Sequence, residues 1–201
     1  MARRGPYAKG VAKREEILRT ALEVVDRNGM RGTSVRELAA AVDLTQAGLL
    51  HHFGSKEELF LAILALRDDE DLRGTGGVDV IDRFLLVTGR NAQTPGMVQL
   101  FTSTASAATS DPAHPAHAWF AERYVRVRTA LADAMRERQA TGEMPGDVDA
   151  EQLAAVMTAV SDGMQLQWML DPSTDMAAHV RLVWDLALRS APRVAGLSAP
   201  A

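Results

Sequence analysis

The chain has 201 residues, of which 47% are hydrophobic and 24% are charged, and it contains no cysteine. Such a composition is typical of a soluble globular protein, and the lack of thiols excludes disulfides and thiolate metal sites. No apolar run is long enough to span a membrane, and the basic first ten residues lack the apolar core of a signal peptide. We therefore expect a cytoplasmic protein.

The net charge of −4 hides an asymmetry between the two ends of the chain. Residues 1–56 hold ten Lys and Arg against six Asp and Glu, and the remainder holds 12 basic against 20 acidic residues. A basic head on an acidic body is expected where only the head meets a polyanion such as nucleic acid. An N-terminus can also be basic by chance, and charge alone does not separate this alternative from nucleic-acid binding.

Ala, Leu, Arg and Glu recur at helical spacing and strand-type alternation is scarce, which predicts an all-α fold of about nine helices. We expect the helices at 10–28, 34–41, 45–52, 56–72, 78–91, 95–109, 115–140, 149–170 and 174–190. Residues 1–55 are then a small head with a basic arm, 56–192 a larger helical domain, and 193–201 a disordered tail.

Two short capped helices separated by the turn 42–44 follow the plan of a helix-turn-helix. Ser34 with Glu37 predicts a capping box on the first, and Thr45 caps the second. The second helix must then present one face to the major groove of DNA, where Gln46 suits adenine and Ala47 suits a thymine methyl group. The predicted DNA contacts are Lys13, Arg14, Thr33, Ser34, Thr45, Gln46, Ala47, Gly48, His51, His52 and Lys56.

The segments REEIL at 14–18, TSVRELA at 33–39 and LTQAGLLHHFGSKEEL at 44–59 resemble the TetR family of regulators, with a match over about 11–64. The resemblance implies an all-helical homodimer whose variable C-terminal domain holds a small-molecule pocket. Two positions depart from the family pattern. Asp43 replaces a turn glycine, which Asp tolerates because it accepts left-handed dihedrals. Leu50 replaces a tyrosine that meets a phosphate, and Leu50 lacks the hydroxyl needed for that contact.

Aromatic, methionine and hydroxyl side chains of the middle helices are typical of the lining of a ligand cavity, although ordinary core packing explains them equally well. The predicted effector contacts are Phe84, Thr88, Phe101, Thr102, Trp119, Phe120, Tyr124, Met157, Ser161, Met164 and Gln165. Few charged residues fall among these positions, so we expect an apolar or neutral effector.

Apolar residues at helical spacing on the last two helices predict either core packing or a dimer seam, and the resemblance favours the seam. The predicted interface residues are Leu153, Val156, Val160, Trp168, Val180, Val183, Trp184 and Ala187.

Histidines occur in two pairs. His51 and His52 are neighbours on a helix and point about 100° apart, which favours DNA contact or packing over a shared metal. His114 and His117 are a possible metal pair without a third ligand nearby, so capping and surface roles are favoured. We expect no metal, no cofactor and no catalytic site.

The sequence therefore predicts a repressor that binds palindromic operator DNA and is released by a small-molecule effector. Two alternatives stay open: a DNA-binding regulator without small-molecule control, and an activator. An enzyme with an incidental helix-turn-helix is disfavoured because no catalytic motif has supporting context.

Overall fold

A computed structural model describes residues 6–28 and 34–189, and these residues form nine helices and no strand. The all-α prediction is confirmed for this part of the chain. The helices are α1 (Pro6–Asn28), α2 (Val35–Ala41), α3 (Gln46–Phe53), α4 (Lys56–Gly74), α5 (Val80–Asn91), α6 (Pro95–Ser110), α7 (His117–Thr141), α8 (Ala150–Leu170) and α9 (Met176–Leu188). The predicted tail at 193–201 lies outside the described residues.

Side-chain caps explain where the helices of the head begin. Ser34 Oγ accepts a hydrogen bond from Glu37 N at 3.2 Å while Glu37 Oε2 accepts one from Ser34 N at 2.9 Å, so the predicted capping box is present. Thr45 Oγ1 accepts from Gly48 N at 3.0 Å and opens α3. Each bond satisfies a backbone donor that the first helical turn leaves without a partner.

The start of α7 differs from the prediction, because the helix begins at His117 and not at Pro115. Asp111 Oδ1 accepts from Ala113 N at 2.9 Å, and His114 Nδ1 accepts from Ala116 N at 3.1 Å. These local bonds hold the preceding segment in turns. His117 Nδ1 lies 2.7 Å from the carbonyl oxygen of Ala108, so both histidines serve local backbone bonds.

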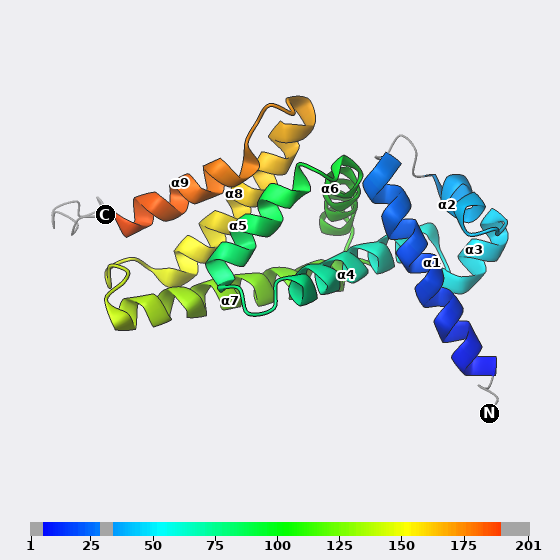
Figure 1. The fold of residues 1–201 in the computed structure, drawn as a ribbon, viewed down its shortest axis with the longest axis horizontal. Helices are drawn as coiled ribbons and strands as arrows, with labels where there is room; N and C mark the ends of the chain where they lie inside the picture. Colours follow the sequence, from blue (N-terminus) through cyan, green and yellow to red (C-terminus); the bar gives the residue numbers. More distant parts are fainter. Residues whose placement is uncertain (1–5, 29–33, 190–201) are drawn as a thin grey trace.

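The molecule is elongated, with α1–α3 at one end and α5, α7, α8 and α9 at the other (Figure 1). Helix α4 runs from the head into the body, and α6 stands between the two. One apolar core joins Leu38 and Leu49 of the head and Ile63 of α4 to Leu100 of α6 and Phe120 of α7. The predicted boundary at residue 55 stays a prediction, and the apolar packing is continuous across it.

A second core fills the body, where α5, α7, α8 and α9 bury residues such as Leu85, Met135, Met157 and Val180. A smaller cluster around Val98 and Trp168 ties α6 to α8. The head and body are therefore joined through packed helices, and a shift of α6 must disturb both the first core and this smaller cluster. No helix in the described ranges is long and apolar enough to cross a membrane.

Candidate DNA interface and effector pocket

The turn between α2 and α3 depends on one left-handed residue. Asp43 has φ 54°, and within the described ranges it is the one residue other than glycine with a positive φ. Its short polar side chain tolerates this conformation at little cost, which is why the turn survives without the usual glycine. The backbone then returns so that Leu44 N donates to Ala39 O at 2.9 Å, which locks α3 against α2.

Helix α3 has one buried and one exposed face. Leu49 and Phe53 are buried and hold the helix against the head. Gln46, Ala47 and His51 are exposed on the opposite face, as a helix that enters a DNA groove requires. His52 is half-buried, and its ring centroid lies 6.2 Å from that of His51.

Two glycines of the helix-turn-helix occupy positions where the local structure disfavours a side chain. A Cβ built on Gly48 would lie 3.2 Å from Thr45 Oγ1, so a side chain there would press on the cap of α3. Gly54 ends α3 with φ 93°, a left-handed conformation that favours glycine, and a Cβ there would also meet the Glu58 carboxylate. Gly48, one of the predicted DNA contacts, therefore also has a structural reason to be glycine.

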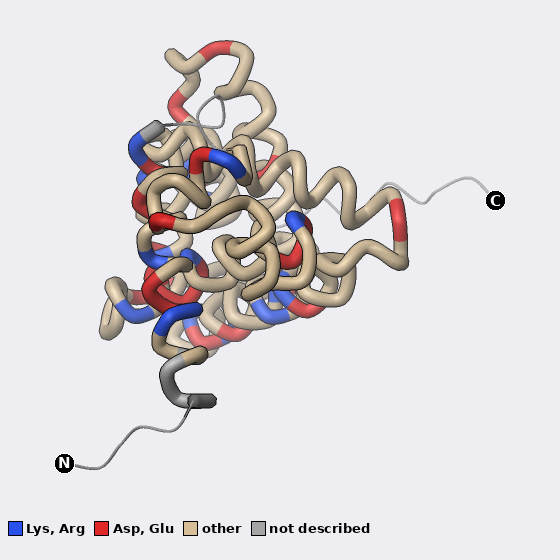
Figure 2. Tube along the Cα trace, turned by 90° about the vertical axis from the view of Figure 1, so that its right-hand side faces the viewer, with Lys and Arg blue, Asp and Glu red and all other residues tan. Residues whose placement is uncertain are grey.

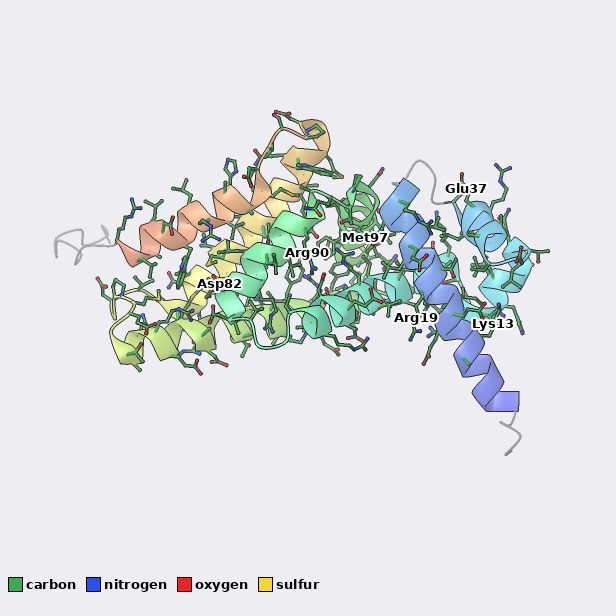
Figure 3. The ribbon with its side chains drawn as sticks, in the orientation of Figure 1. Lys13, Arg19, Glu37, Asp82, Arg90 and Met97 are labelled. Atoms are coloured by element: carbon green, nitrogen blue, oxygen red, sulfur yellow. The ribbon has the colours of Figure 1, made fainter. Side chains whose placement is uncertain are left out.

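The cationic residues predicted to meet phosphate already have partners, and of these Arg14 and Lys56 are exposed while Lys13 is half-buried. Lys13 pairs with Glu16 at 2.9 Å, the Arg14 guanidinium lies 4.7 Å from the centre of the Phe53 ring, and the Lys56 ammonium lies 5.2 Å from that of Phe60. Figure 3 shows Lys13 and Arg19 along α1 in the head. Exposed pairs of this kind contribute little stability, so phosphate can replace Glu16 as the partner of Lys13.

Ser34 is engaged in its capping box, where its hydroxyl donates to Glu37 Oε2 at 2.8 Å. These bonds lower the pKa of Glu37, the backbone bond from Ser34 most of all. Thr33, the other predicted contact at this helix start, lies outside the described residues. A phosphate at this point would therefore be met by backbone donors of α2 before the Ser34 hydroxyl.

The described side chains of the head do not form a uniform basic surface. Six cationic side chains between residues 10 and 56 are matched by six acidic ones, and the excess of positive charge rests on Arg3, Arg4, Lys9 and Arg31, whose side chains lie outside the described residues. Seen from the head end, basic and acidic segments alternate (Figure 2). Most of the excess positive charge of the head therefore belongs to the predicted basic arm.

A cavity of about 210 Å³ lies between α4, α5, α7 and α8 in the body. Four predicted effector residues line it: Phe84, Thr88, Ser161 and Gln165. Thr88 Oγ1 and Ser161 Oγ are 3.2 Å apart and hydrogen-bonded across the cavity wall. Apolar side chains of Val80, Val87, Val127 and Leu131 complete much of the lining.

The other predicted effector residues lie elsewhere. Phe101 and Trp119 line a neighbouring cavity of about 50 Å³. Phe120, Met157 and Met164 are buried in the apolar cores, where they have no free surface for a ligand. Thr102 Oγ1 donates to Val98 O at 2.9 Å, and the Tyr124 hydroxyl donates to Asp162 Oδ2 at 2.7 Å.

Charged residues of the cavity wall were missed by the sequence analysis, and the apolar or neutral character of the effector stays a prediction. Six charged side chains line the cavity: Asp68 and Asp71 of α4, Arg83 of α5, Arg123 and Arg126 of α7, and Asp162 of α8. In the sequence, Asp68 and Asp71 belong to a run of charges that is typical of a solvated helix face. The spacing of Asp68 and Asp71, three residues apart, was the signal available.

Ion pairs connect this cavity wall to the head. Asp68 accepts from Arg123 Nε at 3.0 Å and from Arg126 at 2.9 Å. Asp71 accepts from Arg67 at 3.1 Å and lies 3.6 Å from Arg90 of α5, which is labelled in Figure 3. Arg67 also reaches Asp26 of α1 at 3.2 Å. A chain of charges thus runs from α1 through α4 to α5.

Burial shifts two titratable groups at the cavity. Desolvation raises the pKa of Asp162, against the opposing effects of the hydrogen bond from Tyr124 and the charge of Arg123. Desolvation also raises the pKa of Tyr124, and the neighbouring Asp162 carboxylate adds to this rise. The tyrosine therefore stays a hydrogen-bond donor at neutral pH, and the carboxylate gains from any further donor or cation.

The predicted dimer residues are mostly internal. Leu153, Trp168, Val180, Trp184 and Ala187 are each 9% exposed or less and pack inside the chain, so packing within one chain accounts for their burial and their place at an interface stays a prediction. Val160 and Val183 are half-buried, and Val156 is 49% exposed. The Arg138 guanidinium lies 5.8 Å from the centre of the Trp184 ring and covers it.

Other exposed apolar side chains of α8 and α9, together with the predicted Val156, make up a set that we call the strip. Its members on α8 are Val156, Leu166, Met169 and Leu170, and those on α9 are Leu182, Leu186 and Leu188. The two helices pack against each other, so the strip spans adjoining elements. Apolar groups gathered in this way are typical of a surface that another protein covers.

Metal chemistry has no support in the described ranges, where no group of three His, Asp or Glu side chains is placed to hold an ion. The described residues therefore present two candidate sites, the exposed face of α3 in the head and the cavity in the body. Helix α4 connects the two. This arrangement defines a helix-turn-helix DNA-binding protein with a separate pocket in its helical body.

Comparison with known proteins gives the family. The model of bacterial regulatory proteins of the TetR family matches residues 17–63, and that of the C-terminal domain of BetI-type transcriptional repressors matches residues 83–191. The chain therefore belongs to the TetR family and is a DNA-binding transcriptional regulator.

Individual relatives agree with this assignment over most of the chain. The transcriptional repressor AcnR of Corynebacterium efficiens is 28% identical over 179 residues, which cover 86% of this chain and 90% of AcnR. A TetR-family regulator from a Rhodococcus species has a TM-score of 0.66 at 23% identity and covers 88% of this chain and 99% of its own. Thermus thermophilus FadR, a TetR-family repressor solved with lauroyl-CoA, has a TM-score of 0.53 at 21% identity, with 91% and 100% covered.

Proposed function

We propose that the protein is a homodimeric repressor that leaves a palindromic operator when a small molecule occupies the cavity between α4, α5, α7 and α8. The observation that carries this proposal is the position of Asp68 and Asp71. They line the cavity on α4, the helix that follows the recognition helix α3 after a gap of two residues. A ligand in contact with α4 can therefore act on the placement of the head.

The ion pairs supply a route for that action. Arg67 joins Asp26 of α1 to Asp71 of α4, and Arg90 of α5 approaches the same carboxylate. A ligand that binds one arrangement of these groups more tightly than another shifts the population of head positions by that difference in affinity. The repressor FadR, solved with lauroyl-CoA, shows that a protein of this fold accommodates a ligand.

The exposed face of α3 is the proposed reader of DNA sequence. Gln46 and Ala47 would contact base edges, with His51 beside them, whereas Lys13, Arg14 and Lys56 would contact phosphates and fix the position of the head. A dimer places two such helices roughly 34–36 Å apart or a multiple of this distance, which calls for an operator with twofold symmetry.

Two further points belong to the proposal. The protein acts in the cytoplasm, where the DNA of a bacterium lies, and it acts by binding alone, without catalysis. The name repressor follows that of the relative AcnR. An activator, or a regulator without small-molecule control, would use the same head, and the experiment below separates the second of these from the proposal.

Selection of bound duplexes from a random pool should return a near-palindrome, and this sequence then serves as the probe in a titration. Compounds that raise the melting temperature of the protein by mass action should also weaken operator binding. The proposal is wrong if no duplex is preferred over random sequence at moderate salt. If compounds bind the cavity and operator affinity stays constant, small-molecule control is refuted.

A further inference from the structure

The charges that line the effector cavity are unevenly compensated. Asp68 is bound by both Arg123 and Arg126, and Asp71 is bound by Arg67 and approached by Arg90. These pairs neutralise two of the three carboxylates and two of the three guanidinium groups that face the cavity. The remaining carboxylate belongs to Asp162 of α8, and the remaining guanidinium to Arg83 of α5.

Asp162 is held by neutral donors only. Its Oδ2 accepts from the Tyr124 hydroxyl at 2.7 Å, and its Oδ1 lies 3.5 Å from Gln165 Nε2. The neighbouring Arg123 directs its Nε to Asp68, at 3.0 Å. A carboxylate has about four acceptor sites, so this group keeps unused capacity toward the cavity. Its desolvation makes a cationic donor the partner that it lacks.

Arg83 of α5 is a cationic side chain without an anionic partner among the described residues. Its side chain lines the same cavity and is half-buried. In the part of the chain that the structure describes, it forms no hydrogen bond, ion pair or ring contact, so its five donors are available to a ligand. A planar fork of donors of this kind suits a carboxylate.

We propose that the cavity binds a small dipolar molecule with a protonated nitrogen at one end, which meets Asp162, and a carboxylate at the other, which meets Arg83. This inference rests on the proposed function of the cavity as the effector site. Phe84, Val87 and Val127 of the cavity lining offer apolar contact to a short carbon chain. The hydrogen-bonded pair Thr88 and Ser161 adds a polar contact along the wall.

Unbranched ω-amino acids of increasing length are suitable probes, because each has an alkylamine, an alkanoate and an alkanol of matched length. Calorimetric titration of the full-length protein with each compound measures the contribution of each charge. At the optimal length, we expect the amino acid to bind at least about tenfold more tightly than the matched amine or alkanoate, since each removes one charge-assisted contact. The alkanol should bind most weakly.

Two variants assign the charges to residues. Asp162→Asn keeps the acceptor for Tyr124 and should reduce binding of the amino acid to the level of the alkanoate. Arg83→Gln should reduce it to the level of the alkylamine. Asp82→Asn, at an exposed neighbour on α5, and Arg73→Gln, at an exposed end of α4, are the matched controls and should bind like the unaltered protein.

The proposal is overturned if the alkanol binds as tightly as the amino acid, or if the preference for charged compounds survives both cavity variants. Thermal unfolding of each variant confirms that a loss of binding is not a loss of fold. Operator affinity measured with and without the same compounds tests the proposed function separately. Binding of the amino acid with unchanged operator affinity contradicts effector control and supports the ligand class.

Discussion

Thr45 and its neighbours hold the proposed recognition helix α3 in place on the head. The Thr45 hydroxyl caps α3, Gly48 leaves room for that cap, and the left-handed Asp43 returns the chain so that α3 packs on α2. The exposed side chains of Gln46 and Ala47 then project from a rigid first turn. Side chains held in this way discriminate between bases because the wrong base leaves donors without partners.

Gln46→Ala should relax discrimination at one base pair in each operator half by about 1–3 kcal/mol, since the bidentate amide is lost. Lys56→Ala is the comparison, because loss of a phosphate contact weakens all sequences about equally and lowers the salt slope by about one. Binding to a panel of single-base operator variants at several salt concentrations measures both effects. Unchanged discrimination in Gln46→Ala would remove Gln46 from the base contacts.

Asp162→Asn should raise the melting temperature of the ligand-free protein at neutral pH. The pKa of Asp162 is raised by burial, so the folded state holds its proton more tightly than the unfolded state does. The penalty for its charge therefore appears as the pH rises from the ordinary pKa of Asp through the raised value, and it is complete above both. The gain of the variant should shrink as the pH falls below this range, and equal melting temperatures at all pH values would contradict it.

At the scale of elements, α4 connects the two functions of the molecule. It follows the recognition helix, packs in the core of the head through Leu59 and Ile63, and carries Asp68 and Asp71 into the cavity wall. Its partners lie on α1, α5 and α7, so α4 is held by ion pairs from three other helices. These pairs are well placed to distinguish two positions of the helix, since charged contacts at low exposure depend steeply on geometry.

Arg67→Met should destabilise the fold by about 1–3 kcal/mol, because it leaves Asp26 and Asp71 partly buried without their shared cation. Burial already raises the pKa of Asp26, and the charge of Asp71 adds to this rise. The loss should therefore be smaller in mildly acidic solution, where the Asp26 carboxylate takes up a proton. Urea unfolding at two pH values measures it.

Arg73→Met is the matched control for this test. Arg73 pairs with Asp69 on the same helix, and both side chains are more than half exposed. Loss of an exposed pair should change the free energy of unfolding by less than about 1 kcal/mol. If the two variants unfold alike, the link between α1 and α4 does not depend on Arg67.

At the scale of the whole molecule, the strip on α8 and α9 is the surface that we propose for the dimer. Leu170 is 90% exposed, and Leu166, Leu182 and Leu186 are each more than half exposed. Apolar area of this extent on two adjoining helices is costly in water unless a second copy covers it. The strip lies on the body, away from α3, so a dimer built there leaves both recognition helices accessible.

Leu182→Asp should yield a folded monomer with much weaker operator binding, because the charge falls on an exposed apolar position and not in the core. Val125→Asp is the control, since Val125 is 56% exposed on α7 and lies outside the strip. Light scattering gives the mass of each, and circular dichroism gives its helix content. A dimer that persists in Leu182→Asp would place the interface elsewhere.

The sequence by itself determined where most helices begin and end. The caps at Ser34, Thr45 and Asp149, and the stops that follow each helix, depend on bonds within a few residues, so the helices could be predicted to within a few positions. The helix-turn-helix followed for the same reason. The exposed face of α3 could also be predicted, because its two buried residues, Leu49 and Phe53, are spaced one turn apart.

Tertiary structure alone decided which face of each body helix lies inside. Leu182 and Trp184 are two residues apart and point to nearly opposite sides of α9, and only the packing on α8 shows that Trp184 is internal and Leu182 external. In the same way, Asp68 and Arg123 look solvated in the sequence and meet across a cavity wall in the structure. Periodicity determines which residues share a face, whereas the rotation and crossing of the helices determine what that face meets.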